Sequence, residues 1–215
     1  MLSVSTFSGY TLRMESSYHH DGLREELIET GRVMLIRDGL AAFSLRALAR
    51  ELGVSHAAPY RHFASKEELV RAIIGEDDLS FRRALLEGAE GVSDPEELLY
   101  RLGEAYIFFF LEHPQVLTLF FLLPGQAAIQ GDRLAALFRS PPAGDSGYPE
   151  DESFLLLRRA AAAQAGRFPG LSEREIIFGY WAKAHGIASL LVAQKGILPS
   201  ENLREEVRRL VRSAF

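Results

Sequence analysis

Apolar residues recur along this chain at the intervals of helices rather than of strands. In residues 21–39 they stand three or four positions apart, as Leu23 and Leu27 do. Such intervals place side chains on one face of an α-helix, whereas a half-buried strand alternates at every second residue. Asp21 is expected to cap this first helix and Gly39 to end it. Because strict alternation is scarce in the sequence, the pattern predicts an all-α fold.

A second, shorter helix and a tight turn follow directly. Residues 44–53 repeat the helical interval, with Ser44 at the position of an N-cap and Gly53 at the end. A third short helix is expected over residues 55–63. Two short helices joined by a tight glycine-containing turn have the geometry of a helix-turn-helix.

The remainder of the chain carries further helical segments. Ser65 and Glu68 have the spacing of a capping box, which opens a longer helix. The pattern restarts near residue 91, where Ser93 or Asp94 is expected to cap the next helix. Residues 140–151 have the composition of a loop. The helical segments expected from residue 65 onward are 65–85, 93–113, 114–125, 126–139, 152–165, 173–194 and 200–213.

The composition is that of an ordinary globular chain, and it narrows the chemistry. Of the 215 residues 47% are apolar and 25% are charged, and the formal net charge is -5. Cysteine is absent, which excludes disulfides, thiolate metal sites and a cysteine nucleophile. No run approaches the roughly 18 consecutive apolar residues of a membrane span, and the first residues lack the pattern of a signal peptide. We therefore expect a cytoplasmic protein without a membrane partner.

The charge divides the chain into two regions. Residues 14–71 are nearly neutral, and the acidity lies in the residues that follow. Residues 1–18 are expected to form a disordered tail, with Met14 as an alternative start. We expect a helix-turn-helix domain over residues 19–66 and a larger helical domain over residues 67–215.

The region around the predicted turn gathers hydrogen-bond donors beside small side chains. The second helix of a helix-turn-helix can lie in the major groove of DNA, which is wide enough to admit it. Ser44 and Ser55 are expected to cap helix N-termini, whose free amides and positive dipole favour a phosphate. Ala57 permits close approach to base edges. The predicted DNA-binding residues are Ser44, Arg46, Ser55, His56, Ala57, Tyr60, His62 and Lys66.

Ordinary helical packing is the alternative interpretation of these helices, and Phe63 is expected to belong to the core. The segment SLRALARELGVSHAAPYRHFASKEELV favours DNA binding, because it closely resembles the DNA-binding domain of the TetR family of transcriptional regulators. The resemblance covers about residues 19–71 and implies a homodimer that binds a palindromic operator in double-stranded DNA. It also implies that Tyr60 and Lys66 contact phosphates. The positions that it places toward the bases are Arg46, Ser55, His56 and Ala57.

Large aromatic residues concentrate in the C-terminal region, where they can form a core or line an apolar ligand pocket. Trp181 and His185 lie one helical turn apart, and Gly186 follows. This spacing resembles a TetR subfamily named for the same Trp, His and Gly of its C-terminal domain. A hydrogen-bonded core histidine is the alternative interpretation of His185. The residues predicted to line an effector pocket are Phe109, Phe120, Phe121, Trp181 and His185.

The last two predicted helices are expected to form a dimer interface. Residues 173–194 are apolar or small on nearly every side, so most of that surface must be covered. Two helices from each subunit would then form a four-helix bundle. Burial within one subunit is the alternative. The small residues expected to permit close approach of a partner helix are Ala182, Ala184, Gly186 and Ala188.

These features predict a DNA-binding transcriptional regulator, expected to be a repressor that a small, largely apolar effector releases from its operator. The alternative is a dimeric DNA-binding regulator without an effector. A helical enzyme is a third interpretation, but the sequence has no nucleophile elbow, no H-E-x-x-H motif and no phosphate loop. The histidines also lack metal-ligand spacing with carboxylates. We therefore predict no catalytic residue, no metal and no cofactor.

Overall fold

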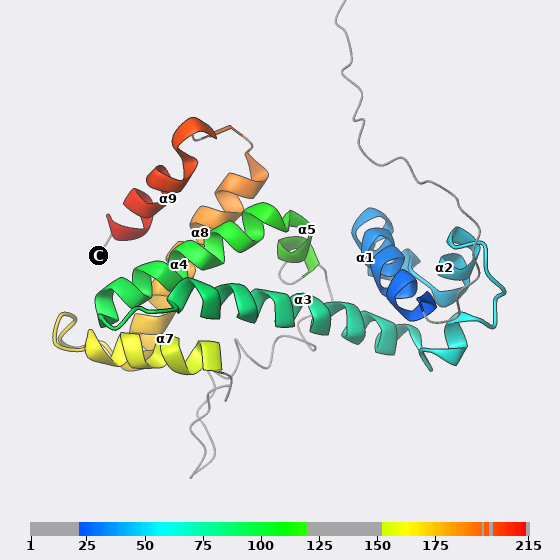
Figure 1. The fold of residues 1–215 in the computed structure, drawn as a ribbon, viewed down its shortest axis with the longest axis horizontal. Coiled ribbons are helices and arrows are strands. Elements are labelled where there is room, and N and C mark those ends of the chain that lie inside the picture. Colours follow the sequence, from blue (N-terminus) through cyan, green and yellow to red (C-terminus); the bar gives the residue numbers. More distant parts are fainter. Residues whose placement is uncertain (1–21, 120–151, 195, 198–199, 214–215) are drawn as a thin grey trace, which may run out of the picture.

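Every regular element that the structure describes is helical (Figure 1). The computed structural model describes residues 22–119, 152–194, 196–197 and 200–213. The elements are α1 (Leu23–Ala42), α2 (Leu45–Glu51), the 3-10 helix η1 (Pro59–Arg61), α3 (Lys66–Ala89), α4 (Pro95–Glu112), α5 (Pro114–Leu117), α7 (Glu152–Ala163), α8 (Glu173–Ala193), the 3-10 helix η3 (Ser200–Asn202) and α9 (Leu203–Arg212). The predicted all-α fold is confirmed.

Three predicted segments lie outside the described residues. They are the N-terminal tail over residues 1–18, the helix over residues 126–139 and the loop over residues 140–151.

Three of the predicted helix starts are confirmed by their capping hydrogen bonds. At the start of α3 the Ser65 hydroxyl accepts a hydrogen bond from the Glu68 amide at 3.2 Å. The Ser44 hydroxyl accepts a hydrogen bond from the Ala47 amide at 3.2 Å. Asp94, rather than Ser93, caps α4, and its carboxylate accepts from the Glu97 amide at 2.7 Å. Each cap satisfies one of the amides that a helix leaves without an internal partner.

The first helix has Gly22 in its N-cap position, which forms no side-chain cap. Asp21, the predicted cap, lies outside the described residues. At the other end Gly39 interrupts the helical backbone with a φ of +76°, a left-handed conformation that favours glycine. The predicted end of regular helix at Gly39 is therefore confirmed, although hydrogen bonding continues to Ala42.

Helix α3 connects the two parts of the molecule. Figure 1 shows it running from α1 and α2 at one end to α4 and α7 at the other. Its 24 residues correspond to a length of about 36 Å. It packs on α1 near its start and on α4 further along. Because α3 is one continuous helix, the proposed boundary between residues 66 and 67 falls in its first turn and stays a prediction.

A small apolar core holds α1, α2 and the start of α3 together. Phe43, Phe63 and Leu69 are each at most 2% exposed, so the prediction that Phe63 belongs to the core is confirmed. Gly31 lets α1 approach α3 closely, since a Cβ atom at this position would lie 3.1 Å from Ile73 Cδ1. The short helices are therefore fixed to α3 by tight packing.

A buried ion pair also joins α1 to α3. Arg32 Nε lies 3.0 Å from Asp77 Oδ1, and the two side chains are only 13% and 9% exposed. Arg32 also contacts the carboxylates of Glu29 and Glu76. Burial raises the pKa of Asp77 although the Arg32 guanidinium acts in the opposite direction. The ion pair lies between α1 and the middle of α3.

Helix α4 is the centre of the larger, C-terminal part, where it packs against α3, α7, α8 and α9. Its buried residues include Tyr106, Ile107 and Phe110. Gly103 allows α9 to come close, since a Cβ atom there would lie 3.2 Å from Val211 Cγ1. This arrangement places α9 on one side of α4 and α3 on another (Figure 1).

Candidate functional site

The turn after α2 has the predicted geometry. Gly53 has a φ of +67°, and the Val54 amide donates a hydrogen bond to the Ala49 carbonyl at 3.0 Å. Glycine adopts this left-handed conformation without the strain that a side chain would bring. Helix α2 therefore ends sharply, and the chain turns at once toward η1.

The second helix of the motif is much shorter than predicted. Residues 55–63 form turns and the single 3-10 turn η1 instead of a continuous α-helix. Pro59 has no amide hydrogen, so regular helix can begin at this residue but cannot pass through it. The predicted capping role of Ser55 is wrong, because η1 follows Ala58 and has no side-chain cap. The Ser55 carbonyl instead accepts from the Ala58 amide at 2.9 Å.

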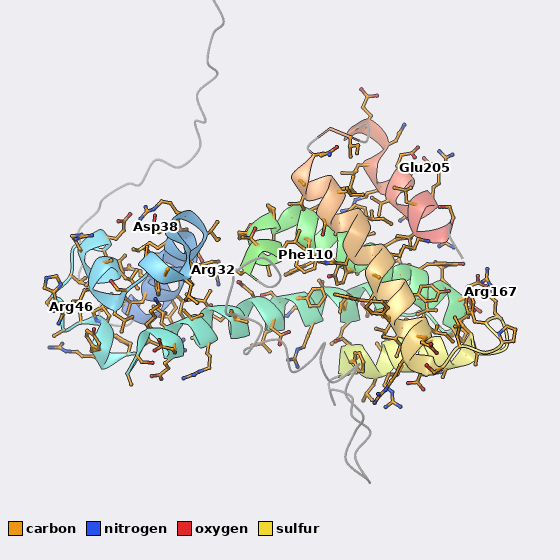
Figure 2. The ribbon with its side chains drawn as sticks, turned by 180° about the vertical axis from the view of Figure 1, so that it is seen from behind. Arg32, Asp38, Arg46, Phe110, Arg167 and Glu205 are labelled. Carbon is orange, nitrogen blue, oxygen red and sulfur yellow. The ribbon has the colours of Figure 1, made fainter. Side chains whose placement is uncertain are left out.

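Exposed donors surround η1 at one end of the molecule. Tyr60 is 50% exposed, and Figure 2 shows Arg46 at the end opposite the C-terminal helices. Successive side chains of a 3-10 helix point about 120° apart, so the burial of Pro59 turns Tyr60 and Arg61 outward. We name the following exposed residues the reader surface: Arg46, Ser55, His56, Ala57, Tyr60 and Arg61.

Arg61 is absent from the residues predicted from the sequence, although it lies within the segment that resembles the DNA-binding domain of the TetR family. Its place directly after Tyr60 in a short helix that starts at Pro59 is the signal that would have identified it. The interpretation of residues 55–63 as a longer helix obscured that signal, because it left the outward direction of each side chain undefined.

The other predicted DNA-binding residues are less exposed. Lys66 is half-buried, and its ammonium group donates to the Leu40 carbonyl near the end of α1. His62 is half-buried, and the Ser44 hydroxyl oxygen is engaged by the amide of Ala47. These three residues lie beside the reader surface rather than on it.

The aromatic residues predicted for the effector pocket fall into separate contacts. The rings of Trp181 and His185 stack with centroids 5.2 Å apart. The Tyr106 hydroxyl lies 3.0 Å from Nδ1 of His185, and the Ser189 hydroxyl lies 3.4 Å from Nε2. Burial lowers the pKa of His185, so its imidazole is neutral at pH 7. Both ring nitrogens have polar neighbours within the subunit, as the core-histidine interpretation requires.

Phe109 lies on another side of the same aromatic cluster. The ring of Phe81 connects the two sides, with centroids 5.4 Å from Tyr106 and 5.2 Å from Phe109. Phe120 and Phe121 lie outside the described residues. The predicted effector pocket therefore stays a prediction.

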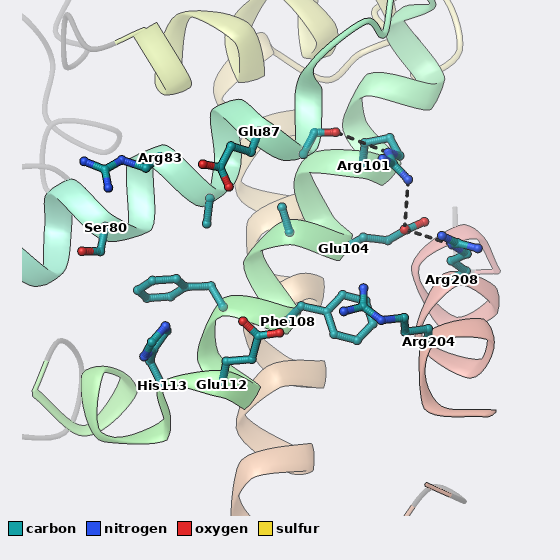
Figure 3. Close-up of a pocket in the computed structure, with 14 residues that line it drawn as sticks. Ser80, Arg83, Glu87, Arg101, Glu104, Phe108, Glu112, His113, Arg204 and Arg208 are labelled. Carbon is teal, nitrogen blue, oxygen red and sulfur yellow. Dashed lines mark hydrogen bonds and ion pairs between the residues drawn. The ribbon is translucent and has the colours of Figure 1, made fainter. Parts of the chain in front are cut away.

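A groove of about 520 Å³ lies between α3, α4 and α9 (Figure 3). Of the described residues predicted for the effector pocket, Phe109 alone lines it, and seven of its fourteen lining residues are charged. Its principal side chains are Arg83, Arg101, Glu104, Phe108, Arg204 and Arg208. In the part of the chain that the structure describes, the groove included, no group of three His, Asp or Glu side chains is placed to hold a metal ion.

Helix α8 presents an apolar face to solvent. Its length would suffice for a membrane span, and so would the mean hydropathy of 1.4 of its most apolar 18 residues. Only 22% of that stretch is buried within the subunit. One face packs on α4, α7 and α9, which is the behaviour of a helix in a folded core. On the other, Phe178 is 40% and Leu190 is 56% exposed.

The predicted small residues of α8 do not all face outward. Ala184 and Ala188 are buried within the subunit, at 7% and 0% exposure, and are closed to a partner. Their expected role in partner contact is therefore wrong. Ala182 is exposed and Gly186 is half-buried, so these two remain on the accessible side.

The short helices, the glycine turn and the continuous α3 define a helix-turn-helix regulator with a helical C-terminal domain. Comparison with known families agrees. Residues 27–73 match the description "Bacterial regulatory proteins, tetR family", and residues 99–214 match "Tetracyclin repressor-like, C-terminal domain". The chain belongs to the tetR family, whose members are transcriptional regulators and not enzymes.

Curated relatives match only over the DNA-binding region. The HTH-type transcriptional regulator Rv1816 of Mycobacterium tuberculosis (strain ATCC 25618 / H37Rv) is 38% identical over 52 residues, which are 24% of this chain and 22% of that protein. The regulator Mb1846 of Mycobacterium bovis gives the same values. The matched part thus spans about a fifth of the length of these relatives.

Solved structures match over nearly the whole chain. A protein of unknown function from Rhodococcus sp. RHA1 is 30% identical, with a TM-score of 0.60, over 92% of this chain and 97% of that one. A TetR-like transcriptional regulator from the same source has a TM-score of 0.64 at 18% identity, over 88% and 94%. The fatty acid degradation regulator FadR from Bacillus halodurans has a TM-score of 0.63 at 14% identity, over 91% and 96%. The last two similarities concern the fold alone.

Proposed function

We propose that this protein is a homodimeric repressor that binds a palindromic DNA operator through the reader surface and is released by a small-molecule effector. The observation that carries the proposal is the reader surface itself. It places two guanidinium groups, an imidazole and a phenol around a short helix at one end of the molecule. Such donors suit phosphate and base-edge contacts, and local placement makes an overall positive charge unnecessary.

Dimerisation is supported by the outward face of α8. An exposed strip that includes Phe178 and Leu190 costs free energy in water and is covered when two copies meet. A twofold axis would place two reader surfaces about one turn of DNA apart, which matches a palindromic operator. We expect such a protein in the cytoplasm, where it meets DNA.

Release by an effector requires two conformations with different affinities for it. Ordinary allosteric coupling amounts to about 1–3 kcal/mol, which changes affinity roughly 5- to 150-fold. Helix α3 is the natural lever, because it holds the helix-turn-helix at one end and contacts α4 at the other. The alternative, a dimeric regulator without an effector, shares the reader surface and lacks only this coupling.

Selection of bound duplexes from a random DNA pool at about 0.15 M salt tests the proposal, because nonspecific phosphate binding is weak at that salt concentration. We expect enrichment of a palindromic motif with half-sites about 10 base pairs apart. Enrichment of a single unpaired half-site would contradict the dimeric arrangement, and no enrichment at all would contradict DNA recognition by this surface.

Replacing Tyr60 with phenylalanine is expected to weaken operator binding about tenfold, since it removes one hydrogen bond to a charged phosphate. Binding to unrelated DNA should weaken by a similar factor, because phosphate contacts carry no sequence information. The measurement is the affinity for the selected operator and for a scrambled duplex. Tyr100→Phe is the control, because that hydroxyl donates to Glu96 in the C-terminal domain at 2.6 Å. A changed sequence preference in Tyr60→Phe would assign this residue to a base instead.

A further inference from the structure

We propose that the groove between α3, α4 and α9 binds a small organic carboxylate with an aromatic or apolar body, and that this is the effector site. The second half of the statement rests on the proposed function, whereas the first concerns binding alone. The groove is separate from the stacked pair Trp181 and His185, neither of which lines it.

The first argument is the excess of guanidinium groups around one buried carboxylate. Glu104 is 5% exposed and lies on α4 at the base of the groove. Its Oε2 atom accepts from Arg208 Nε at 3.2 Å and lies 3.8 Å from Arg101 Nη1 (Figure 3). Arg204 lies one turn before Arg208 on the same side of α9. Two guanidinium groups thus share this one carboxylate, and Arg204 adds a third positive group beside them, which favours an additional anion.

The second argument is the aromatic surface beneath one of these arginines. The guanidinium carbon of Arg204 lies 4.6 Å from the centroid of the Phe108 ring. Phe108 and Phe109 both line the groove, together with Ala84 and Ala105. A carboxylate that pairs with Arg204 can therefore rest its apolar part on these side chains. Planar guanidinium groups bind carboxylates with two parallel hydrogen bonds, which would orient the ligand.

The third argument limits the charge of the ligand. The lining has four arginines against Glu87, Glu104 and Glu112, which leaves a net charge of about +1 when His113 is neutral. Polyanions such as nucleic acids or nucleoside triphosphates would meet repulsion from the exposed Glu87 and Glu112. A monocarboxylate fits this balance, and the carboxylates of the groove can accept hydrogen bonds from donors on its body.

The position of the groove links ligand binding to α3. Ser80, Arg83 and Glu87 belong to the second half of α3, while Arg204 and Arg208 belong to α9 (Figure 3). A molecule held between them contacts α3, which packs on α1 of the helix-turn-helix domain. Binding would thus favour one position of α3 relative to α9, which is the differential contact that an allosteric effector needs.

The test is isothermal titration calorimetry, which measures the affinity of the full chain, without DNA, for phenylacetate and for the uncharged phenylacetamide. We expect phenylacetate to bind at least about tenfold more tightly than the amide, and Arg204→Gln to remove that preference. Arg204 is exposed, so its replacement should leave folding intact, which circular dichroism checks. Arg159→Gln, at an exposed position on α7, is the matched control and should bind as the wild type does.

Equal binding of the acid and the amide, no binding of either, or an unchanged affinity in Arg204→Gln would each overturn the site. The effector role is measured separately, as release of the operator by phenylacetate. Arg204-dependent binding without release would leave the carboxylate site standing and overturn its assignment as the effector site. Failure of the chain to bind DNA would refute the proposed function, but it would not change the result of the titration, which is measured without DNA.

Discussion

Replacing Leu190 with glutamate is expected to convert the protein from a dimer to a monomer at micromolar concentration. Leu190 is 56% exposed on the outward face of α8 within one subunit. If that face is the dimer interface, the twofold axis brings two new carboxylates into it. Burying a charge without a partner costs several kcal/mol, so the dimer should weaken by at least about 100-fold. Analytical ultracentrifugation or light scattering gives the mass directly.

The control for this change is Leu79→Glu. Leu79 lies on α3 and is 62% exposed, so the same substitution adds the same charge away from α8. This variant should stay dimeric and fold as the wild type does. A Leu190→Glu protein that keeps the mass of a dimer would show that the outward face of α8 is not the interface. The wild type itself running as a monomer would contradict the dimer altogether.

Loss of the dimer should also abolish operator recognition, although Leu190 lies far from the reader surface along the chain. Each subunit contacts one half-site, and linking two contacts raises affinity through a high effective concentration. A monomer retains only the weak binding of one half-site. Leu190→Glu should therefore lose operator binding while keeping its helical content, and a preserved affinity would separate DNA binding from dimerisation.

Local features of the fold were predictable because their causes lie within a few residues. Ser44 and Asp94 cap helices through hydrogen bonds to amides three positions away. Gly53 ends α2 because the turn needs a left-handed residue. At residues 55–63 a local rule failed, because Pro59 cannot stand inside the continuous helix that the periodicity predicts. The reader surface was therefore largely predictable, apart from Arg61.

Contacts between distant segments were not predictable in the same way. Lys66 and Leu40 are 26 positions apart, and Arg32 and Asp77 are 45 positions apart. A helix that is apolar on nearly every side, as α8 is, also gives no signal of which face the subunit covers. The sequence thus predicts that Ala184 contacts a partner helix, whereas in the structure it is buried in its own subunit. The charged groove depends on three helices meeting, which periodicity does not determine.

Replacing Asp77 with alanine is expected to destabilise the protein by about 3 kcal/mol at pH 7, since removing one partner of a buried ion pair typically costs 3–5 kcal/mol. The lower end applies because Arg32 keeps contacts with Glu29 and Glu76. Chemical denaturation measures the free energy of unfolding. Glu51→Ala is the control: it breaks an ion pair with Arg37 whose side chains are 51% and 46% exposed, and it should leave stability nearly unchanged.

The pH dependence gives an independent check on the same group. Because burial raises the pKa of Asp77 in the folded protein above its ordinary value of 3.8, the folded state binds this proton more tightly than the unfolded state. Its contribution to stability is therefore full below pH 3.8 and is lost as the pH rises through the folded pKa. Carboxyls with a lowered pKa, such as Glu96 and Glu175, contribute stability that increases with pH instead. Asp77→Asn removes only the first contribution.

As the pH rises from about 3.8, the free energy of unfolding of the wild type should therefore decrease relative to that of Asp77→Asn. A difference that moves the other way would mean that Arg32 outweighs burial and holds Asp77 ionised.

A double-mutant cycle with Arg32→Ala tests whether the two side chains act as a pair. Each single change leaves the other charge buried without its partner, so the double variant Arg32→Ala, Asp77→Ala should lose less stability than the two single changes added together. Additive losses would show that the two side chains do not act as a pair in holding α1 to α3.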